Sequence, residues 1–235
     1  SHLMLEGDML VAPAAERPGY PGYRFGLADE DVAEHERTPL ADLPQTDDNG
    51  AASFAVSLDK MPDSSRPQEA QIVVRMAESG GRAVERKLVL PVMPRAAMLG
   101  VKPLFDGSVA EGDKAGFDVV LVAPDGTRLA QPGVRYELMK LEQRYQWYRQ
   151  GSSWEYEPIK STRRVADGDL DLATDAPARL TLAPQPGRYR LDVRSPDVNG
   201  PLTSLSFDVG FYSDGGADTP DLLETSIDKP DYRAG

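Results

Sequence analysis

Strict alternation of apolar and polar residues is the feature that most constrains this chain. In GRYRLDVRSP (187–196), Tyr189, Leu191 and Val193 alternate with charged or polar residues. A period of two places successive side chains on opposite faces of a strand, so one face of this segment is expected to be buried. The same pattern recurs in PLTSLSFDVGFY (201–212) and along most of the chain. The sequence therefore predicts short strands rather than helices.

Composition agrees with this prediction. The chain has 235 residues, of which 40% are hydrophobic, with 20 prolines and 21 glycines. That is enough apolar material for one large or two small cores, and the prolines and glycines indicate many turns. We therefore expect an all-β protein made of tandem seven-stranded antiparallel β-sandwiches of the fibronectin or immunoglobulin type.

The first sandwich is expected at residues 1–94. Its SHLM start (1–4) resembles a cloning-vector remnant, and an acidic stretch at 28–50 is predicted to be a long loop with one helical turn near 30–36. Only about five segments in 1–94 are convincing strands, so this domain is expected to lack part of its N-terminal sequence. Four of these predicted strands are MLVAP (9–13), ASFAVSL (52–58), AQIVVRMAES (70–79) and VERKLVLPV (84–92).

The second sandwich is expected at residues 95–212, after the proline-bearing linker PVMPR (91–95), which could also act as a hinge. DGDLDL (167–172) is interpreted as a turn followed by a short strand. The remaining predicted strands are 97–105, 116–129, 134–150, 153–166, 178–184, 187–196 and 201–212. Residues 213–235 are interpreted as a linker and the first strand of a further domain.

Charge and cysteine content exclude several classes of function. The formal net charge is −12, which disfavours binding to a nucleic acid. The absence of cysteine rules out disulfides, thiolate chemistry and cysteine-bound metals. No stretch of about 18 apolar residues is present, so no membrane contact by these residues is expected.

The search for an active site finds no candidate. The two histidines are His2, in the predicted vector remnant, and His35, in the acidic loop without a repeated ligand spacing. DGDLDL lacks the closing glutamate of a calcium-binding EF-hand loop. No Gly-x-Ser-x-Gly, phosphate-loop or His-Glu-x-x-His motif occurs. We therefore predict no catalytic, cofactor-binding or metal-binding residue, no cofactor, and no enzymatic activity.

The segment RYQWYRQGSSWEYEPIK (144–160) holds five aromatic residues, including both tryptophans. It is predicted to be a hairpin that turns near 150–153. Its aromatic rings could pair across the two strands and stabilise the sheet. Alternatively, Trp147, Tyr148 and Trp154 could form an exposed platform for a carbohydrate, as in a sugar-binding or adhesin-type β-sandwich. The structural interpretation is favoured, because Arg144, Arg149 and Glu155 can cover the ring faces.

Four stretches together resemble the bacterial alpha-2-macroglobulin family. They are PGYPGYRFGLADED (18–31), the long segment 100–149, SWEYEP (153–158), and LLETSIDKPDYRAG (222–235), whose "DKP-x-Y-x-x-G" pattern is similar to the first strand of macroglobulin-type domains. The resemblance implies macroglobulin-like domains placed just before the bait-region domain. Residues 213–235 would then begin the bait-region domain.

The resemblance also implies a function. Members of this family are broad-spectrum peptidase inhibitors that close around a protease after it cuts the bait region, and many capture it with a Cys-x-Glu-Gln thioester. The expected partners of this chain are neighbouring domains of the same protein and, through the full-length protein, target proteases. The expected location is the periplasm, anchored to the inner membrane as a lipoprotein with a role in host defence. No functional residue of the family transfers to this chain, so its expected role is that of a scaffold.

Overall fold

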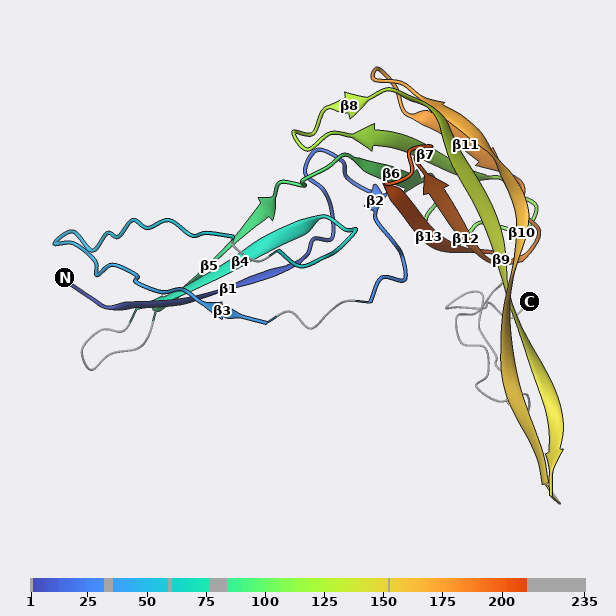
Figure 1. The fold of residues 1–235 in the computed structure, drawn as a ribbon, viewed down its shortest axis with the longest axis horizontal. Coiled ribbons are helices and arrows are strands. Elements are labelled where there is room, and N and C mark those ends of the chain that lie inside the picture. Colours follow the sequence, from blue (N-terminus) through green and yellow to red (C-terminus); the bar gives the residue numbers. More distant parts are fainter. Residues whose placement is uncertain (1, 32–35, 59–60, 77–83, 152, 211–235) are drawn as a thin grey trace, which may run out of the picture.

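The computed structural model describes residues 2–31, 36–58, 61–76, 84–151 and 153–210, and all of its regular structure is β. In these residues thirteen strands form three antiparallel sheets in two bodies (Figure 1). The prediction of an all-β fold is confirmed. The described residues include no helix that is long and apolar enough to cross a membrane.

The first body is a four-stranded sheet. Its order is β3-β1-β4-β5, from β1 (Leu5–Pro13), β3 (Thr38–Pro39), β4 (Gln68–Met76) and β5 (Val84–Val92). One face is apolar, because cross-strand partners such as Met9 and Ile72 both belong to the buried cluster that also contains Ala70. The predicted strands at 9–13, 70–79 and 84–92 lie within or overlap these elements, although residues 77–83 lie outside the described part.

The strand predicted at 52–58 is wrong. Residues 51–58 form no strand, yet Phe54, Val56 and Leu58 all line the hollow above β4 and β5, a cavity of about 460 Å³. The alternation in residues 52–58 therefore indicates that every second side chain faces an apolar surface. It does not report backbone pairing, which requires a neighbouring strand edge to bond to.

The second body is a β-sandwich, as predicted. One sheet has the order β10-β9-β12-β13 and the other has the order β11-β7-β6-β2, with β8 beside β7. The strands from the second half of the chain are β6 (Met98–Pro103), β7 (Ala115–Val122), β8 (Arg128–Leu129), β9 (Gln131–Gln150), β10 (Ser153–Leu172), β11 (Ala178–Leu182), β12 (Gly187–Arg194) and β13 (Leu202–Val209). The strand β2 comes from the first half of the chain and is described with the site below.

The sandwich core lies between these two sheets. Phe117 and Phe207 face each other from opposite sheets with ring centroids 5.2 Å apart, and Tyr189 stacks on Phe207 at 5.7 Å. The hydroxyl of Tyr189 donates to the Gln185 carbonyl over 2.6 Å, so its one polar group is satisfied. Alternation in β12 places Tyr189, Leu191 and Val193 in this core, as the sequence predicted.

Of the turn and short strand predicted at 167–172, the turn is wrong and the strand is confirmed, because β10 runs through this segment to Leu172. Gly168 is the cross-strand partner of Tyr136, and a Cβ at Gly168 would lie 2.8 Å from the Tyr136 hydroxyl oxygen. The glycine therefore leaves the space that the tyrosine ring occupies, which is a common use of glycine within a sheet. The pairing of β10 with β9 has two irregularities in its register, one at Arg164/Ala166 before this segment and one at Leu170/Leu172 within it.

Candidate functional site: the junction between the two bodies

Residues 14–30, here called the crossover segment, leave the first body after β1 and lie on the second. Within this segment β2 (Arg24–Phe25) pairs antiparallel with β6, where Phe25 is opposite Gly100. The chain then returns to the first body at β3. Together with the linker 93–97, three stretches of chain therefore connect the bodies, as Figure 1 shows. The first half of the sequence supplies an edge strand to the sandwich of the second half.

Two hydroxyl side chains of β13 hold the crossover segment on the sandwich. The amide of Gly26 donates to Thr203 Oγ1 over 3.1 Å, and Thr203 donates onward to the Leu99 carbonyl over 2.7 Å. The amide of Ala28 donates to Ser204 Oγ over 2.8 Å, and the Ser204 amide donates to the Gly26 carbonyl over 3.0 Å. Thr203 is 1% exposed, so water does not compete for its bonds.

An aromatic cluster covers the outer face of the sheet beside these bonds. Tyr20, Tyr23 and Phe25 pack on Val120 and Val122, and all five are buried. The ring of Tyr20 meets those of Tyr23 and Phe25 edge to face, with centroids 5.8 and 6.2 Å apart. Burial raises the pKa of the Tyr23 hydroxyl above its ordinary value. This packing of the three rings is expected, because aromatic rings bury large areas and prefer edge-to-face contact.

The phenyl ring of Phe25 also requires the absence of a side chain on β6. A Cβ at Gly100 would lie 2.7 Å from the nearest ring carbon of Phe25. Gly100 therefore allows the ring of the edge strand to lie directly over its partner strand.

Arg17 fixes the crossover segment to the turn that follows β7. Its side chain is buried, with the residue 4% exposed, and donates to the carbonyls of Val122, Ala123 and Pro124. Burial lowers the pKa of the guanidinium from its ordinary value. The hydroxyl of Tyr20 donates to the Gly126 carbonyl in the same turn over 2.7 Å. The segment Pro-Asp-Gly (124–126) forms a turn, and carbonyls at 122–126 serve as acceptors for the first half of the chain.

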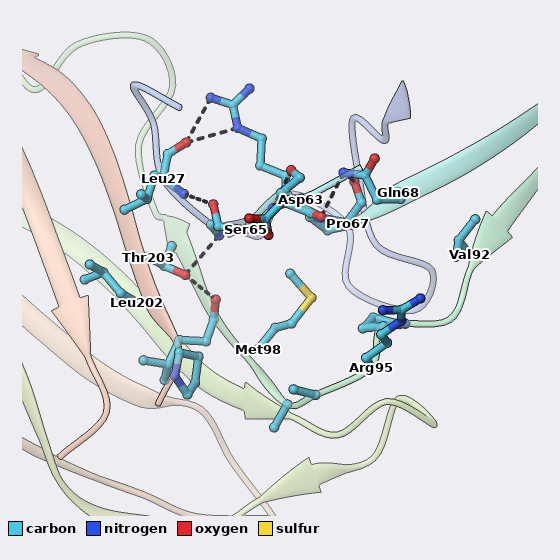
Figure 2. Close-up of a pocket in the computed structure, with 18 of the residues that line it drawn as sticks. Leu27, Asp63, Ser65, Pro67, Gln68, Val92, Arg95, Met98, Leu202 and Thr203 are labelled. Carbon is cyan, nitrogen blue, oxygen red and sulfur yellow. Dashed lines mark hydrogen bonds between the residues drawn. The ribbon is translucent and has the colours of Figure 1, made fainter. Parts of the chain in front are cut away.

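The first body holds the crossover segment from the opposite side, as Figure 2 shows. Arg66 Nε donates to the Leu27 carbonyl over 3.0 Å, and Arg66 Nη2 donates to the carbonyls of Leu27 and Ala28, each over 2.9 Å. The amide of Leu27 donates to Ser65 Oγ over 2.8 Å. Arg66 and Ser65 directly precede β4, so the sheet of the first body positions both side chains.

Glu30 completes this side of the junction. Its carboxylate accepts from the Ser65 amide over 2.6 Å and from Ser64 Oγ over 2.7 Å, and it lies 3.8 Å from Arg66 Nε. Burial alone would raise the pKa of Glu30, but these hydrogen bonds and Arg66 outweigh it and hold the pKa below its ordinary value. Each of these groups stabilises the ionised carboxylate.

A half-open cavity of about 630 Å³ lies beside this network, between the two bodies (Figure 2). Residues of the first body, the linker and the sandwich all line it, among them Met61, Gln68, Met93, Met98 and Thr203. Gln68 donates to the carbonyls of Arg66 and Pro67, whereas its Oε1 is buried without a hydrogen-bond partner. The lining is mostly apolar, and of its polar side chains Ser64, Ser65 and Thr203 are used in hydrogen bonds at the junction.

The aromatic hairpin projects from the far end of the sandwich. The strand β12 pairs with β9 only at residues 135–141, so the outer parts of β9 and β10 form a two-stranded ribbon (Figure 1). The backbones of Trp147 and Tyr156 are cross-strand partners, which agrees with the predicted turn. The side chains of Trp147, Tyr148 and Trp154 lie outside the described residues, so ring pairing against a carbohydrate platform stays a prediction.

The sequence predicts no metal-binding or catalytic residue, and of its two histidines only His2 belongs to the described part of the chain. His2 lies 3.2 Å from Asp48 on the surface, and His35 falls outside the described residues. Among the described residues no group of three histidine, cysteine, aspartate or glutamate side chains could hold a metal ion. The polar side chains of the junction, such as Arg17, Arg66 and Thr203, form hydrogen bonds to backbone groups. This arrangement can hold the two bodies in position relative to each other.

Comparison with protein families divides the chain at the same place. Residues 1–94 match the bacterial alpha-2-macroglobulin MG5 domain, and residues 100–211 match bacterial macroglobulin domain 6. Alpha-2-macroglobulin of Escherichia coli K12 is 27% identical over 98% of this chain and 15% of its own length. Alpha-2-macroglobulin of Xylella fastidiosa 9a5c is 31% identical over 74% of this chain and 11% of its own length.

Solved structures give the same result. The native conformation of E. coli alpha-2-macroglobulin superimposes with a TM-score of 0.66 at 26% identity, over 98% of this chain and 16% of that protein. E. coli alpha-2-macroglobulin activated by porcine elastase gives a TM-score of 0.66 at 25% identity, over 90% of this chain and 19% of that protein. The chain thus spans less than one fifth of the length of these relatives.

Proposed function

Because the chain belongs to the bacterial alpha-2-macroglobulin family, we propose that its two domains form part of the scaffold of a broad-spectrum peptidase inhibitor. The observation that carries this proposal is the junction. Polar side chains at the interface of the two domains, including Arg17, Arg66, Thr203 and Ser204, hydrogen-bond to backbone groups. Such contacts hold domains in place and supply no chemistry of their own.

The names of the relatives support the inhibitor role. One solved relative is E. coli alpha-2-macroglobulin activated by porcine elastase, and another is the trypsin-activated form of the E. coli protein. These names describe proteins that respond to peptidases. We extend that response to the longer protein that would contain this chain, in which a peptidase cuts a bait region and the surrounding domains rearrange around it.

Within that protein, residues 1–94 and 95–212 would form a structural scaffold and would not themselves capture the peptidase. The chain has no cysteine, so it cannot itself form a thioester. Residues 213–235 would connect the frame to the bait-region domain. We also propose a periplasmic location with anchorage at the inner membrane. Cell fractionation with an antibody to the chain would test this location, and recovery in the cytoplasmic fraction would contradict it.

The test of function compares the chain with the full-length inhibitor that would contain it. Elastase or trypsin is incubated with each protein at equal molar ratio, and cleavage of casein is measured beside cleavage of a small chromogenic peptide. We expect the full-length protein to protect casein and to spare the small peptide, because enclosure excludes only large substrates. The isolated chain should protect neither substrate.

Two results would contradict the proposal, and they are distinct. Stoichiometric inhibition by the isolated chain would mean that these domains carry an inhibitory site of their own. Failure of the full-length protein to protect casein would remove the inhibitor role altogether.

A further inference from the structure

We infer that the crossover segment joins the two domains into one rigid unit, so that residues 91–95 do not act as a free hinge. The centre of this unit is the tripeptide Gly26-Leu27-Ala28, here called the bridge tripeptide. The consequence for peptidase trapping, that domain movement takes place at other joints, rests on the proposed function. The rigidity itself does not.

All six backbone polar groups of the bridge tripeptide are hydrogen-bonded, and the two domains share them equally. The Gly26 amide, the Gly26 carbonyl and the Ala28 amide bond to Thr203 and Ser204 of the sandwich. The Leu27 amide, the Leu27 carbonyl and the Ala28 carbonyl bond to Ser65 and Arg66 of the first domain. A rotation of one domain against the other must therefore break one of these two sets.

Breaking either set is costly because the groups are buried or partly buried, with the exception of the exposed bond from Arg66 to the Ala28 carbonyl. A buried backbone group that loses its partner destabilises the folded state, and each set contains three backbone groups. Release from the sandwich would also expose the aromatic cluster of Tyr20, Tyr23 and Phe25. Release from the first domain would remove the partners of Arg66 and Glu30 together.

Close packing at Gly26 adds a steric restraint to these bonds. A Cβ at this position would lie 2.5 Å from the Ser65 carbonyl oxygen, so the backbones of the bridge tripeptide and of the first domain touch directly. The φ angle of Gly26 is 79°, in the region that favours glycine. At this position the contact is between backbone atoms, which cannot yield by a change of rotamer as a flexible side chain can.

The covalent connections lead to the same conclusion. Hinge closure occurs where a few residues of a simple linker absorb large changes in φ and ψ. Here the crossover segment adds an outgoing and a returning connection to the linker 93–97. Arg17 and Tyr20 of the outgoing part bond to the turn at 123–126, and β2 pairs with β6 before the chain returns. Rotation about the linker alone cannot leave these two connections unchanged.

The first test measures a distance between the domains in the 235-residue chain. The chain has no cysteine, so the double variant Lys87→Cys/Thr174→Cys places one spin label on each domain, at exposed positions. Double electron–electron resonance should give one narrow distance distribution. Adding Arg66→Met, which removes the bonds to the Leu27 and Ala28 carbonyls, should at least double its width.

Arg75→Met is the matched control, because Arg75 forms ion pairs with Asp8 and Glu85 within the first domain, away from the junction. Its distribution should stay narrow. A broad distribution in the labelled chain without further change would overturn the inference. So would an equally narrow one with Arg66→Met.

A second measurement covers the case in which Arg66→Met does not fold. Hydrogen exchange of the unsubstituted chain should show the amides of Gly26, Leu27 and Ala28 protected to the same degree as core amides of β7 and β12. Exchange of these three amides at least tenfold faster than the core amides would contradict a rigid junction. No peptidase takes part in either experiment, so their outcomes are independent of the proposed inhibitor function.

Discussion

The amide of Gly26 donates a hydrogen bond to Thr203 Oγ1 over 3.1 Å, although the two residues are separated by 177 positions in the sequence. The Thr203 hydroxyl in turn donates a hydrogen bond to the Leu99 carbonyl over 2.7 Å, so one buried hydroxyl connects the crossover segment, β13 and β6. Stability of the chain should therefore depend on this hydroxyl more than on any ordinary surface threonine.

Replacing Thr203 by valine tests this dependence. Thr203→Val keeps the shape but leaves the Gly26 amide without its acceptor and the Leu99 carbonyl without this donor. We expect the free energy of unfolding to fall by about 1–3 kcal/mol, which is the usual cost of an unsatisfied buried group. Urea denaturation would measure it. Thr181→Val, at an exposed position of β11, is the control, and an equal change in both variants would contradict the role of the hydroxyl.

Glycine at position 26 is tested by comparison with Gly50. Both residues have a φ of 79°, but a Cβ at Gly50 would meet nothing within 4 Å, whereas one at Gly26 would collide with Ser65. Gly50→Ala should cost about 1–3 kcal/mol from backbone strain alone. Gly26→Ala should lower the melting temperature at least twice as much in calorimetry. Equal shifts would mean that the contact with Ser65 relaxes freely.

Protonation of Glu30 should weaken the junction at low pH. Burial acts to raise the pKa of this carboxyl, but the bonds from Ser65 and Ser64 and the charge of Arg66 hold it below the ordinary value of 4.5. The unfolded chain therefore binds this proton more readily, so the contribution of Glu30 is present above about pH 4.5 and is lost as the pH falls through the folded pKa.

Glu30→Gln should accordingly lose less stability than the unsubstituted chain between about pH 5 and pH 3, as measured by urea denaturation at each pH. Glu111→Gln, at an exposed position outside the junction, should show the full loss. Parallel curves for the Glu30→Gln variant and the unsubstituted chain would contradict the role of the carboxylate.

Most of the sandwich could be predicted from the sequence, because its strands bury one face and expose the other. Tyr189, Leu191 and Val193 of β12 alternate clearly and lie in the core as expected. The strand β2 could not be predicted in this way, since two residues show no period. Its partner β6 is also distant in the sequence, and pairing at a sheet edge leaves no local signal.

The candidate site was missed for the same reason. PGYPGYRFGLADED (18–31) resembles a family, and its place within residues 1–94 predicts that it belongs to the first domain alone. Its tyrosines and Phe25 indicate that the segment is buried, but the sequence does not predict the surface on which they pack. Arg17 and Arg66 likewise bond to backbone carbonyls. Every residue has a backbone carbonyl, so no particular residue type in the sequence predicts these contacts.

Removal of the projecting ribbon should leave the sandwich intact. Leu141 and Thr162 are cross-strand partners, so a two-residue Asn-Gly turn can join them in place of residues 142–161. The strand β12 pairs with β9 only at 135–141, and all core contacts lie on the near side of this cut. We expect circular dichroism to retain the β signal and the melting temperature to change by less than about 5 °C. Loss of cooperative unfolding would show that the ribbon stabilises the body.

Both tryptophans of the chain, Trp147 and Trp154, belong to this ribbon, so tryptophan fluorescence reports on the ribbon alone. Rings that pair across strands contribute about 0.2–1 kcal/mol each to the sheet and have no reason to respond to a sugar. A stacking platform must change its emission when a sugar covers it. We therefore expect no change in emission when oligosaccharides are titrated into the chain, with the ribbon-deleted variant plus free tryptophan as control. A saturable change in the intact chain alone would favour the carbohydrate-binding alternative over the structural one.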